Sequence, residues 1–200
     1  SIVTFLGNLA TSTVALAGSS SDLAAALAGS FSSSYTGTVP ITNADYTVAQ
    51  LKAINDATTG SITLSTTNTN LTGTAGDLVS AFAGTITTHT GNITITDTPT
   101  LAQLKAINNA TTGVITLNTT NTALSGDATD LAEALAGIIN YTGNVTVLDT
   151  AYTVSELKAI NAGTTGEITL NNTGVNLNGT AADLVSAFAG TITTHTGNIT

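Results

Sequence analysis

The stretch TVAQLKAIN at residues 47–55 recurs as TLAQLKAIN at residues 100–108 and as TVSELKAIN at residues 153–161, at a constant spacing of 53 residues. In each copy the threonine stands three residues before a Gln or Glu, which is the pattern of a capping box at a helix start. Val48, Leu51 and Ile54 of the first copy share one stripe of such a helix, and Lys52 lies off that stripe. The LKAIN motif therefore predicts a short helix with one buried face. We expect it to end near Thr-Thr-Gly, where Gly60, Gly113 and Gly166 take a left-handed conformation.

A second motif follows LKAIN by 26 residues. It reads Asp-Leu-x-x-Ala-(Phe/Leu)-Ala-Gly and begins at Asp22, Asp77, Asp130 and Asp183. We call it the DLxxA motif. Thr74, Asp127 and Thr180 stand three residues before the last three of these acids, as helix caps do, and the acid suits the positive end of the helix dipole. The motif predicts a second helix with an apolar pair four residues apart, ended by a glycine at Gly84, Gly137 and Gly190.

Short runs of alternating Thr and aliphatic residues separate the two motifs. They occupy residues 61–65, 92–96, 114–118, 144–148 and 167–171. A period of two predicts half-buried strands, and shorter pieces ending at Leu16, Leu71, Leu124 and Leu177 predict additional strands or bends. Strands that alternate with helices at a fixed period call for parallel pairing. We therefore predict a two-layer α/β solenoid of tandem repeats, with short parallel strands on one side and short helices on the other.

The repeats divide the chain without a domain boundary. Residues 1–200 are predicted to be one continuous array, with an incomplete first unit at 1–46, full units at 47–99 and 100–152, and an incomplete last unit at 153–200. Residues 77–94 recur letter for letter at 183–200, which indicates duplication of a two-unit block. We expect the array to continue beyond both ends, because an open solenoid exposes apolar faces.

Composition excludes several classes of function. Only 8% of the residues are charged, and 12 acids against three lysines, with no arginine, give a net charge of −9. Binding to nucleic acid needs a basic surface, so nucleic acid is not an expected partner. No apolar run approaches the roughly 20 residues that span a bilayer, so membrane insertion is not expected. The chain has no cysteine, and disulfides play no part in its fold.

Three phrases of the sequence resemble the repeat regions of very large secreted or cell-surface proteins of marine bacteria, cyanobacteria especially. They are YTVAQLKAIN followed by ATTG-x-ITL (residues 46–64), GTAGDLVSAFAG (residues 73–84) and YTGNVTV (residues 141–147). The resemblance covers essentially the whole chain. It implies an extracellular location and a filament, surface-layer or adhesin role, and it carries no catalytic residue.

Acidic residues near strand ends are the candidate metal ligands. Asp45, Asp97 and Asp149 stand between a strand and the next helix, where they would form a column able to hold calcium between coils. The alternative is a turn or capping role, which one carboxylate per repeat suits better. Proteins of the resembled group often carry calcium-binding glycine-rich nonapeptides, but Gly-Gly-x-Gly-x-Asp is missing here. No cofactor is expected.

No catalytic constellation is present in the sequence. His89 and His195 occupy equivalent Thr-His-Thr-Gly sites two units apart, so they cannot share one metal ion within a chain, and both are expected to be solvated loop residues. There is no cysteine nucleophile, no serine in a recognisable setting with His and Asp, and no glycine-rich phosphate loop. The chain is therefore not expected to be an enzyme.

Two functions fit these observations. The first is an extracellular structural module that forms a rod, filament, sheath or adhesin stalk, and associates end to end with further repeats or copies of itself. The alternative is a ligand-binding surface for ice, glycan or calcium on the Thr- and Asn-rich sheet face. Its basis is a file of central strand threonines at about the interstrand spacing. The file comprises Thr63, Thr94, Thr116, Thr146 and Thr169.

Overall fold

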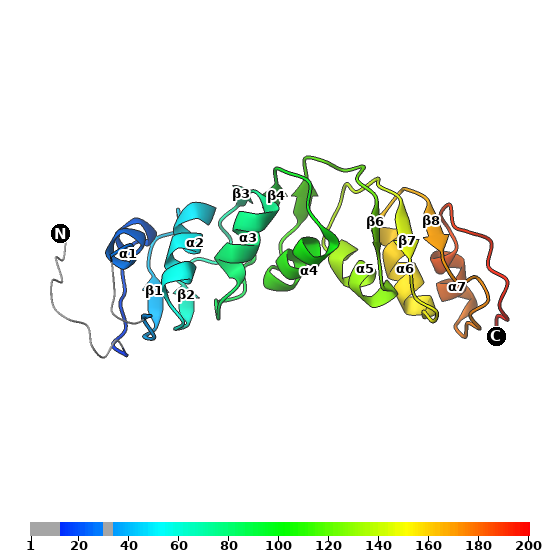
Figure 1. Cartoon of the computed structure of the whole chain (residues 1–200), viewed down its shortest axis with the longest axis horizontal. Coiled ribbons are helices and arrows are strands. Elements are labelled where there is room, and N and C mark those ends of the chain that lie inside the picture. Colours follow the sequence, from blue (N-terminus) through cyan, green and yellow to red (C-terminus); the bar gives the residue numbers. More distant parts are fainter. Residues whose placement is uncertain (1–12, 30–33) are drawn as a thin grey trace.

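The structure is a computed structural model, and it describes residues 13–29 and 34–200. The opening of the expected first unit, residues 1–12, and residues 30–33 lie outside the described residues. The described part is a mixed α/β fold with seven helices and three small parallel sheets. The elements follow one another in chain order along the longest axis, with α1 near one end and α7 near the other (Figure 1).

The LKAIN motifs form the longer helices. These are α2 (Val48–Ala57), α4 (Leu101–Ala110) and α6 (Val154–Gly163). All three predicted capping boxes are confirmed: in α2, Gln50 N–H donates to Thr47 Oγ1 at 3.3 Å and Thr47 N–H donates to Gln50 Oε1 at 2.9 Å. The predicted stripe is also buried, with Leu51 and Ile54 fully inaccessible.

The DLxxA motifs form the shorter helices. These are α1 (Ser20–Leu27), α3 (Ala75–Phe82), α5 (Ala128–Leu135) and α7 (Ala181–Ala187). Thr74 and Thr180 cap α3 and α7 as predicted, each accepting from an Asp N–H at 3.2 Å. The prediction for Asp127 is wrong, because its side chain makes no cap hydrogen bond to α5. Asp149 instead bonds the first N–H of α5, that of Ala128, at 2.6 Å.

Asp127 therefore destabilises the start of α5, and a substitution at this position should relieve the destabilisation. A hydrogen bond with Asp149 and the charge of Asp149 raise the pKa of Asp127 above its ordinary value of 3.8. The repulsion is fully present above the raised pKa and is relieved as the pH falls through it. Asp127→Thr, which copies Thr74 and Thr180, restores a cap and removes one charge. We expect the Tm at pH 7 to rise by about 2–4 °C.

The reverse variant, Thr74→Asp, is the control for Asp127→Thr, because Asp97 stands beside the start of α3 as Asp149 stands beside the start of α5. Thermal melts followed by circular dichroism should give a lower Tm for Thr74→Asp. The advantage of Asp127→Thr should shrink as the pH is lowered. A Tm at pH 7 that falls in Asp127→Thr would contradict this account.

Each predicted alternating run contains a three-residue strand. Of the three additional strands, two begin at Leu71 and Leu124, where short pieces were predicted, and the one at Val39–Ile41 was not predicted. The strands are β1 (Val39–Ile41), β2 (Ile62–Leu64), β3 (Leu71–Gly73), β4 (Ile93–Ile95), β5 (Ile115–Leu117), β6 (Leu124–Gly126), β7 (Val145–Val147) and β8 (Ile168–Leu170). All pairings are parallel, as predicted. Leu71 pairs with Ile93 and Ile93 with Ile115, so paired positions lie 22 residues apart here. We call the segment between one strand and the strand that pairs with it a coil.

The strands do not form one continuous sheet. They form the groups β1-β2, β3-β4-β5 and β6-β7-β8, because the chain steps from one sheet to the next at the connections between β2 and β3 and between β5 and β6. Leu71 and Leu124 begin their strands rather than end the pieces that were predicted to precede them. The apolar side chains nevertheless form one cluster that runs from Leu23 in α1 to Ala187 in α7.

The predicted reason for the glycines is wrong. No glycine in residues 13–29 and 34–200 has a positive φ, and α2 and α4 end on extended threonines, Thr58 and Thr111. The glycines instead allow close approach. A Cβ on Gly60 or Gly113 would overlap the carbonyl of Gly37 or Gly91 in the preceding coil. The third residue of Thr-Thr-Gly is therefore fixed by contact between coils.

Candidate functional site

The polar residues that the repeats keep lie along the seams between consecutive helices. Lys105 of α4 reaches across to α5, where its Nζ lies 2.5 Å from Asp130 Oδ1 and 2.9 Å from Glu133 Oε2. Lys158 of α6 makes the same crossing to Asp183, at 2.6 Å. These pairs are partly exposed, so they add little to stability. They orient neighbouring helices rather than build a reactive centre.

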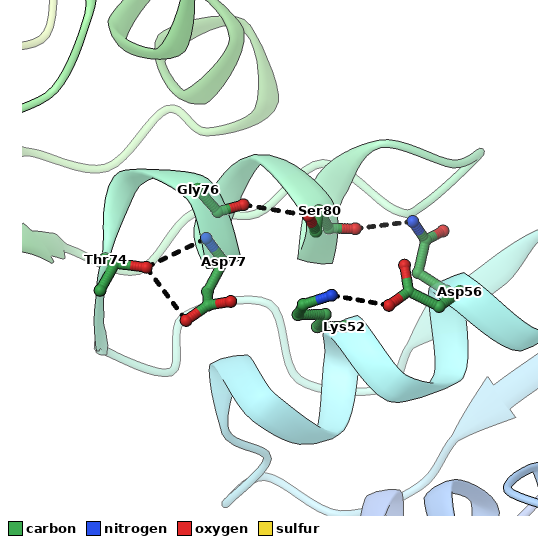
Figure 2. Close-up of polar contacts among 7 residues, drawn as sticks. Lys52, Asp56, Thr74, Gly76, Asp77 and Ser80 are labelled. Atoms are coloured by element: carbon green, nitrogen blue, oxygen red, sulfur yellow. Dashed lines mark hydrogen bonds and ion pairs between the residues drawn. The ribbon is translucent and has the colours of Figure 1, made fainter.

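The seam between α2 and α3 differs from the other two. Lys52 Nζ bonds Asp56 Oδ2 within its own helix at 2.7 Å, while the carboxylate of Asp77 accepts from Thr74 Oγ1 at 3.0 Å (Figure 2). A hollow of about 360 Å³ lies here, bordered by Lys52, Asp56 and Asp77. The hydrogen bond that Lys52 donates to Asp56, and then the charge of Asp56, raise the pKa of Lys52 above 10.5. The amine is therefore protonated at neutral pH and is no nucleophile.

The asparagines that close the LKAIN motifs join each helix to the next. Their Nδ2–H groups donate to carbonyls in the last turn of the following helix, at 2.6–2.8 Å. The pairs are Asn55 with Ser80, Asn108 with Glu133 and Asn161 with Ser186. Carbonyls in the last turn lack the N–H partner four residues on that carbonyls of the helix interior have. Sequence reasoning missed this role, although the same Asn in three copies was a signal.

Each of these asparagines is matched to a glycine. The side-chain oxygens of Asn55, Asn108 and Asn161 lie where a Cβ on Gly84, Gly137 and Gly190 would stand. These glycines follow the DLxxA helices, and they were predicted to end them. Their second requirement is room for the asparagine of the preceding coil.

The three candidate calcium ligands do not come together. Asp97 Oδ1 and Asp149 Oδ2 each accept from the first N–H of the helix in the preceding coil, Ala75 at 2.7 Å and Ala128 at 2.6 Å. In the first coil Asn43 takes this place, accepting from Ser20 N–H at 2.7 Å. Asp45 is exposed and accepts from Asn43 at 2.6 Å, which lowers its pKa. Asp97 and Asp149 therefore each cap a helix of the preceding coil, as the alternative interpretation predicted, whereas Asp45 caps none.

The prediction that the histidines are solvated is wrong. His89 is fully buried, and its Nε2 lies 2.8 Å from the carbonyl of Thr69, so Nε2 carries the proton of the neutral ring. Its Nδ1 lies 3.4 Å from Thr111 Oγ1 in the next coil. His195 is half-buried and bonds the carbonyl of Val175 at 2.7 Å. Both rings bind the coil before them.

Tyrosine takes the place of these histidines in the other units. Tyr35 and Tyr141 each donate a hydroxyl to a carbonyl of the preceding coil, that of Val14 and that of Thr122. Burial raises the pKa of Tyr141 to about 12, so its hydroxyl stays protonated and donates. This replacement of a buried histidine by tyrosine was the signal in the sequence that both residues lie inside.

The neighbouring apolar residue changes together with the ring. Phe82 precedes His89 by seven residues, with ring centres 5.5 Å apart, and Phe188 stands in the same relation to His195. The residues six positions before Tyr141 and eight before Tyr35 are Leu135 and Leu27. A larger ring is therefore paired with a smaller neighbour, as constant core volume requires.

This exchange gives a prediction about acid stability. Burial lowers the pKa of His89 below 6.5, so the folded state resists the proton that the unfolded state accepts. The contribution of neutral His89 is present above the unfolded pKa and is lost as the pH falls through 6.5 toward the folded pKa. The double variant Phe82→Leu with His89→Tyr copies the unit of Leu135 and Tyr141. We expect its Tm to fall less between pH 7.5 and pH 5 than that of the parent chain.

The reverse exchange, Leu135→Phe with Tyr141→His, is the matched control and should increase the acid sensitivity. Carboxylate titration is common to all three proteins, so the difference between them isolates the ring. Equal losses of Tm in all three would refute the prediction.

The threonine file is present in short pieces. Thr94 pairs in register with Thr72 and Thr116, and Thr146 pairs with Thr169. Thr63 and Thr169 are exposed, whereas Thr94, Thr116 and Thr146 are half-buried. The named strands belong to three sheets, and Pro40 and Ser125 occupy two of their central positions.

Within residues 13–29 and 34–200, no three His, Asp or Glu side chains gather closely enough to hold a metal ion. None of the described helices has the length and apolarity to cross a membrane. Comparisons with known protein families, with curated proteins and with solved structures find no match.

Proposed function

We propose that this chain is part of an extracellular structural array, a two-layer α/β solenoid whose stacked coils form a stiff rod. Such a rod would serve in a filament, sheath, surface layer or adhesin stalk. The observation that carries the proposal is that the main packing contacts between helices join consecutive helices from α1 to α7. A chain built in this way gains length with each added repeat, because each repeat packs on its neighbours.

Three kinds of contact between coils support stiffness. Strands pair in parallel across coils, asparagines bind the carbonyls of the next helix, and buried tyrosines or histidines bind the carbonyls of the preceding coil. All three end on main-chain atoms, so each ties one backbone to the next. The glycines Gly60, Gly113 and Gly166 bring the backbones close enough for these contacts. Bending such a rod would break contacts in several places at once.

The surface suits an exposed, inert role. The chain carries a net charge of −9, and its three lysines bond acids on the helix side. Its polar residues are mostly Thr, Asn and Ser, which are solvated without strong long-range fields. The resemblance of its repeats to those of secreted and cell-surface proteins supports the extracellular location.

Electron microscopy tests the structural role. The chain extended by two further copies of residues 95–200 should appear as rods of constant width and greater length than the parent. An antibody against the chain should also label the outside of intact cells of the source organism. Round particles that grow in width, or labelling that requires broken cells, would overturn the proposal.

A further inference from the structure

Residues 77–94 and 183–200 are identical in sequence and differ in surroundings. Leu78 and Ile93 are fully buried in the first copy, and Phe82 is 8% exposed. In the second copy the equivalents Leu184 and Phe188 are only partly buried, and Ile199 is 50% exposed. Val185 is 71% exposed, whereas its equivalent Val79 packs against the core. The same side chains are therefore covered on one side of α3 and uncovered on that side of α7.

A polar group is also left without its partner. In the first copy His89 Nδ1 meets Thr111 Oγ1, which belongs to the LKAIN coil that follows α3. In the second copy His195 Nδ1 is buried and has no hydrogen-bond partner. The uncovered face thus lacks an apolar layer and a hydroxyl group at the same place.

The interior of the chain shows what covers this face. Each of α1, α3 and α5 is followed by an LKAIN helix packed upon it, and the strand after that helix pairs with the strand after the DLxxA helix. The second threonine of Thr-Thr-Gly donates its N–H to the carbonyl at the Tyr or His position in every case. These bonds join Thr59 to Tyr35, Thr112 to His89 and Thr165 to Tyr141, at 2.8–3.3 Å.

The alternation excludes one simple form of association. Helices of the two types alternate from α1 to α7, and no two of the same type are neighbours in the chain. Direct stacking of α7 of one copy on α1 of another would bring two DLxxA helices together. That contact has no example among the described residues, and it would offer His195 no threonine from Thr-Thr-Gly.

We infer that the far face of α7, formed by Leu184, Val185, Phe188, His195 and Ile199, is a binding surface for one further LKAIN coil. The inference rests on the proposed function, and it names the type of coil that extends the array. The occupant is a segment like residues 95–118, with its capped helix, its Thr-Thr-Gly and its following strand.

The glycine of Thr-Thr-Gly is the residue of the added coil that the binding surface restricts most strictly. The glycine of Thr-Thr-Gly lies against the carbonyl of Gly37, Gly91 or Gly143 at the three interior contacts, and Gly197 is the equivalent on the uncovered face. One added methyl group would overlap that carbonyl. Because no described glycine has a positive φ, alanine is excluded by contact alone and not by backbone conformation.

The test extends the full chain after Thr200 with a copy of residues 95–118, the segment that follows Thr94 in the interior. Hydrogen exchange resolved by NMR compares amides 183–188 with amides 77–82, which are identical in sequence and serve as an internal reference. In the parent chain we expect amides 183–188 to exchange faster. The extension should slow them by roughly tenfold or more, toward the rates of amides 77–82.

Two matched extensions make the test specific. One carries Gly113→Ala in the appended copy, and the other replaces it with residues 71–94, a DLxxA coil of equal length. Neither should slow the exchange of amides 183–188. Failure of the first extension, or equal protection by either control, would overturn the inference. The elongated shape of the unextended chain, measured by small-angle X-ray scattering, does not depend on this result, so failure of the inference and failure of the structural role are distinguishable.

Discussion

Replacing Gly113 with alanine is expected to lower the free energy of unfolding by about 3 kcal/mol. The new Cβ would fall on the carbonyl group of Gly91, which is main chain and is held in place by the preceding coil. Relief requires the coils of α3 and α4 to separate, which weakens the pairing of β4 with β5. We expect urea unfolding followed by circular dichroism to show a lower midpoint and a broader transition, because the two halves of the array become less coupled.

Gly76→Ala is the control for this prediction. Gly76 lies in α3, and the nearest atom to its added Cβ is Gln103 Nε2 at 3.9 Å. Alanine here should stabilise the protein by about 0.5–1 kcal/mol, because glycine is unfavourable within a helix. The two Gly→Ala substitutions should thus change the free energy of unfolding in opposite directions. A neutral or stabilising Gly113→Ala would contradict the close-packing role of the Thr-Thr-Gly glycines.

Truncation of Leu104 to alanine is expected to cost about 3 kcal/mol, within the usual range for a buried leucine. Leu104 is fully buried in α4, which packs against both α3 and α5. The core around Leu104 has little freedom to close the resulting cavity, because α3 and α5 pack on α4 from two sides. Equilibrium urea unfolding of the variant measures this loss directly.

Leu148→Ala is the matched control for Leu104→Ala, because Leu148 is 48% exposed just after β7. The same change there should alter the stability by less than about 0.5 kcal/mol. Similar losses at both positions would mean that the apolar stripe of the LKAIN helices does not form the core.

Local signals in the sequence predicted the helices and strands well. The capping boxes at Thr47, Thr100 and Thr153 and the caps at Thr74 and Thr180 are confirmed, because a cap depends on residues three positions apart. The parallel pairing also followed from the period. The break into three sheets did not, since it depends on how the connections between β2 and β3 and between β5 and β6 displace the chain.

Contacts between coils could not be predicted from local sequence patterns. Gly60 and Gly113 were assigned to helix ends, because glycine after a helix usually takes a positive φ. Their actual constraint is a carbonyl more than 20 residues earlier in the sequence. His89 was predicted to be solvated, because its contacts are also with residues distant in the sequence. Tyr141 at the equivalent position nevertheless indicates a buried ring. In a repeat chain, variation between copies at one position is the evidence for such contacts.

The central claim is that consecutive coils stack in a row and give the chain an extended form. Small-angle X-ray scattering in solution measures this most directly, on the chain itself and on the chain with residues 95–200 appended. We predict a radius of gyration well above the roughly 16 Å of a compact protein of this length. The appended block should lengthen the particle while the radius of its cross-section stays constant. A radius of gyration near 16 Å, or a cross-section that widens with the added block, would contradict the claim.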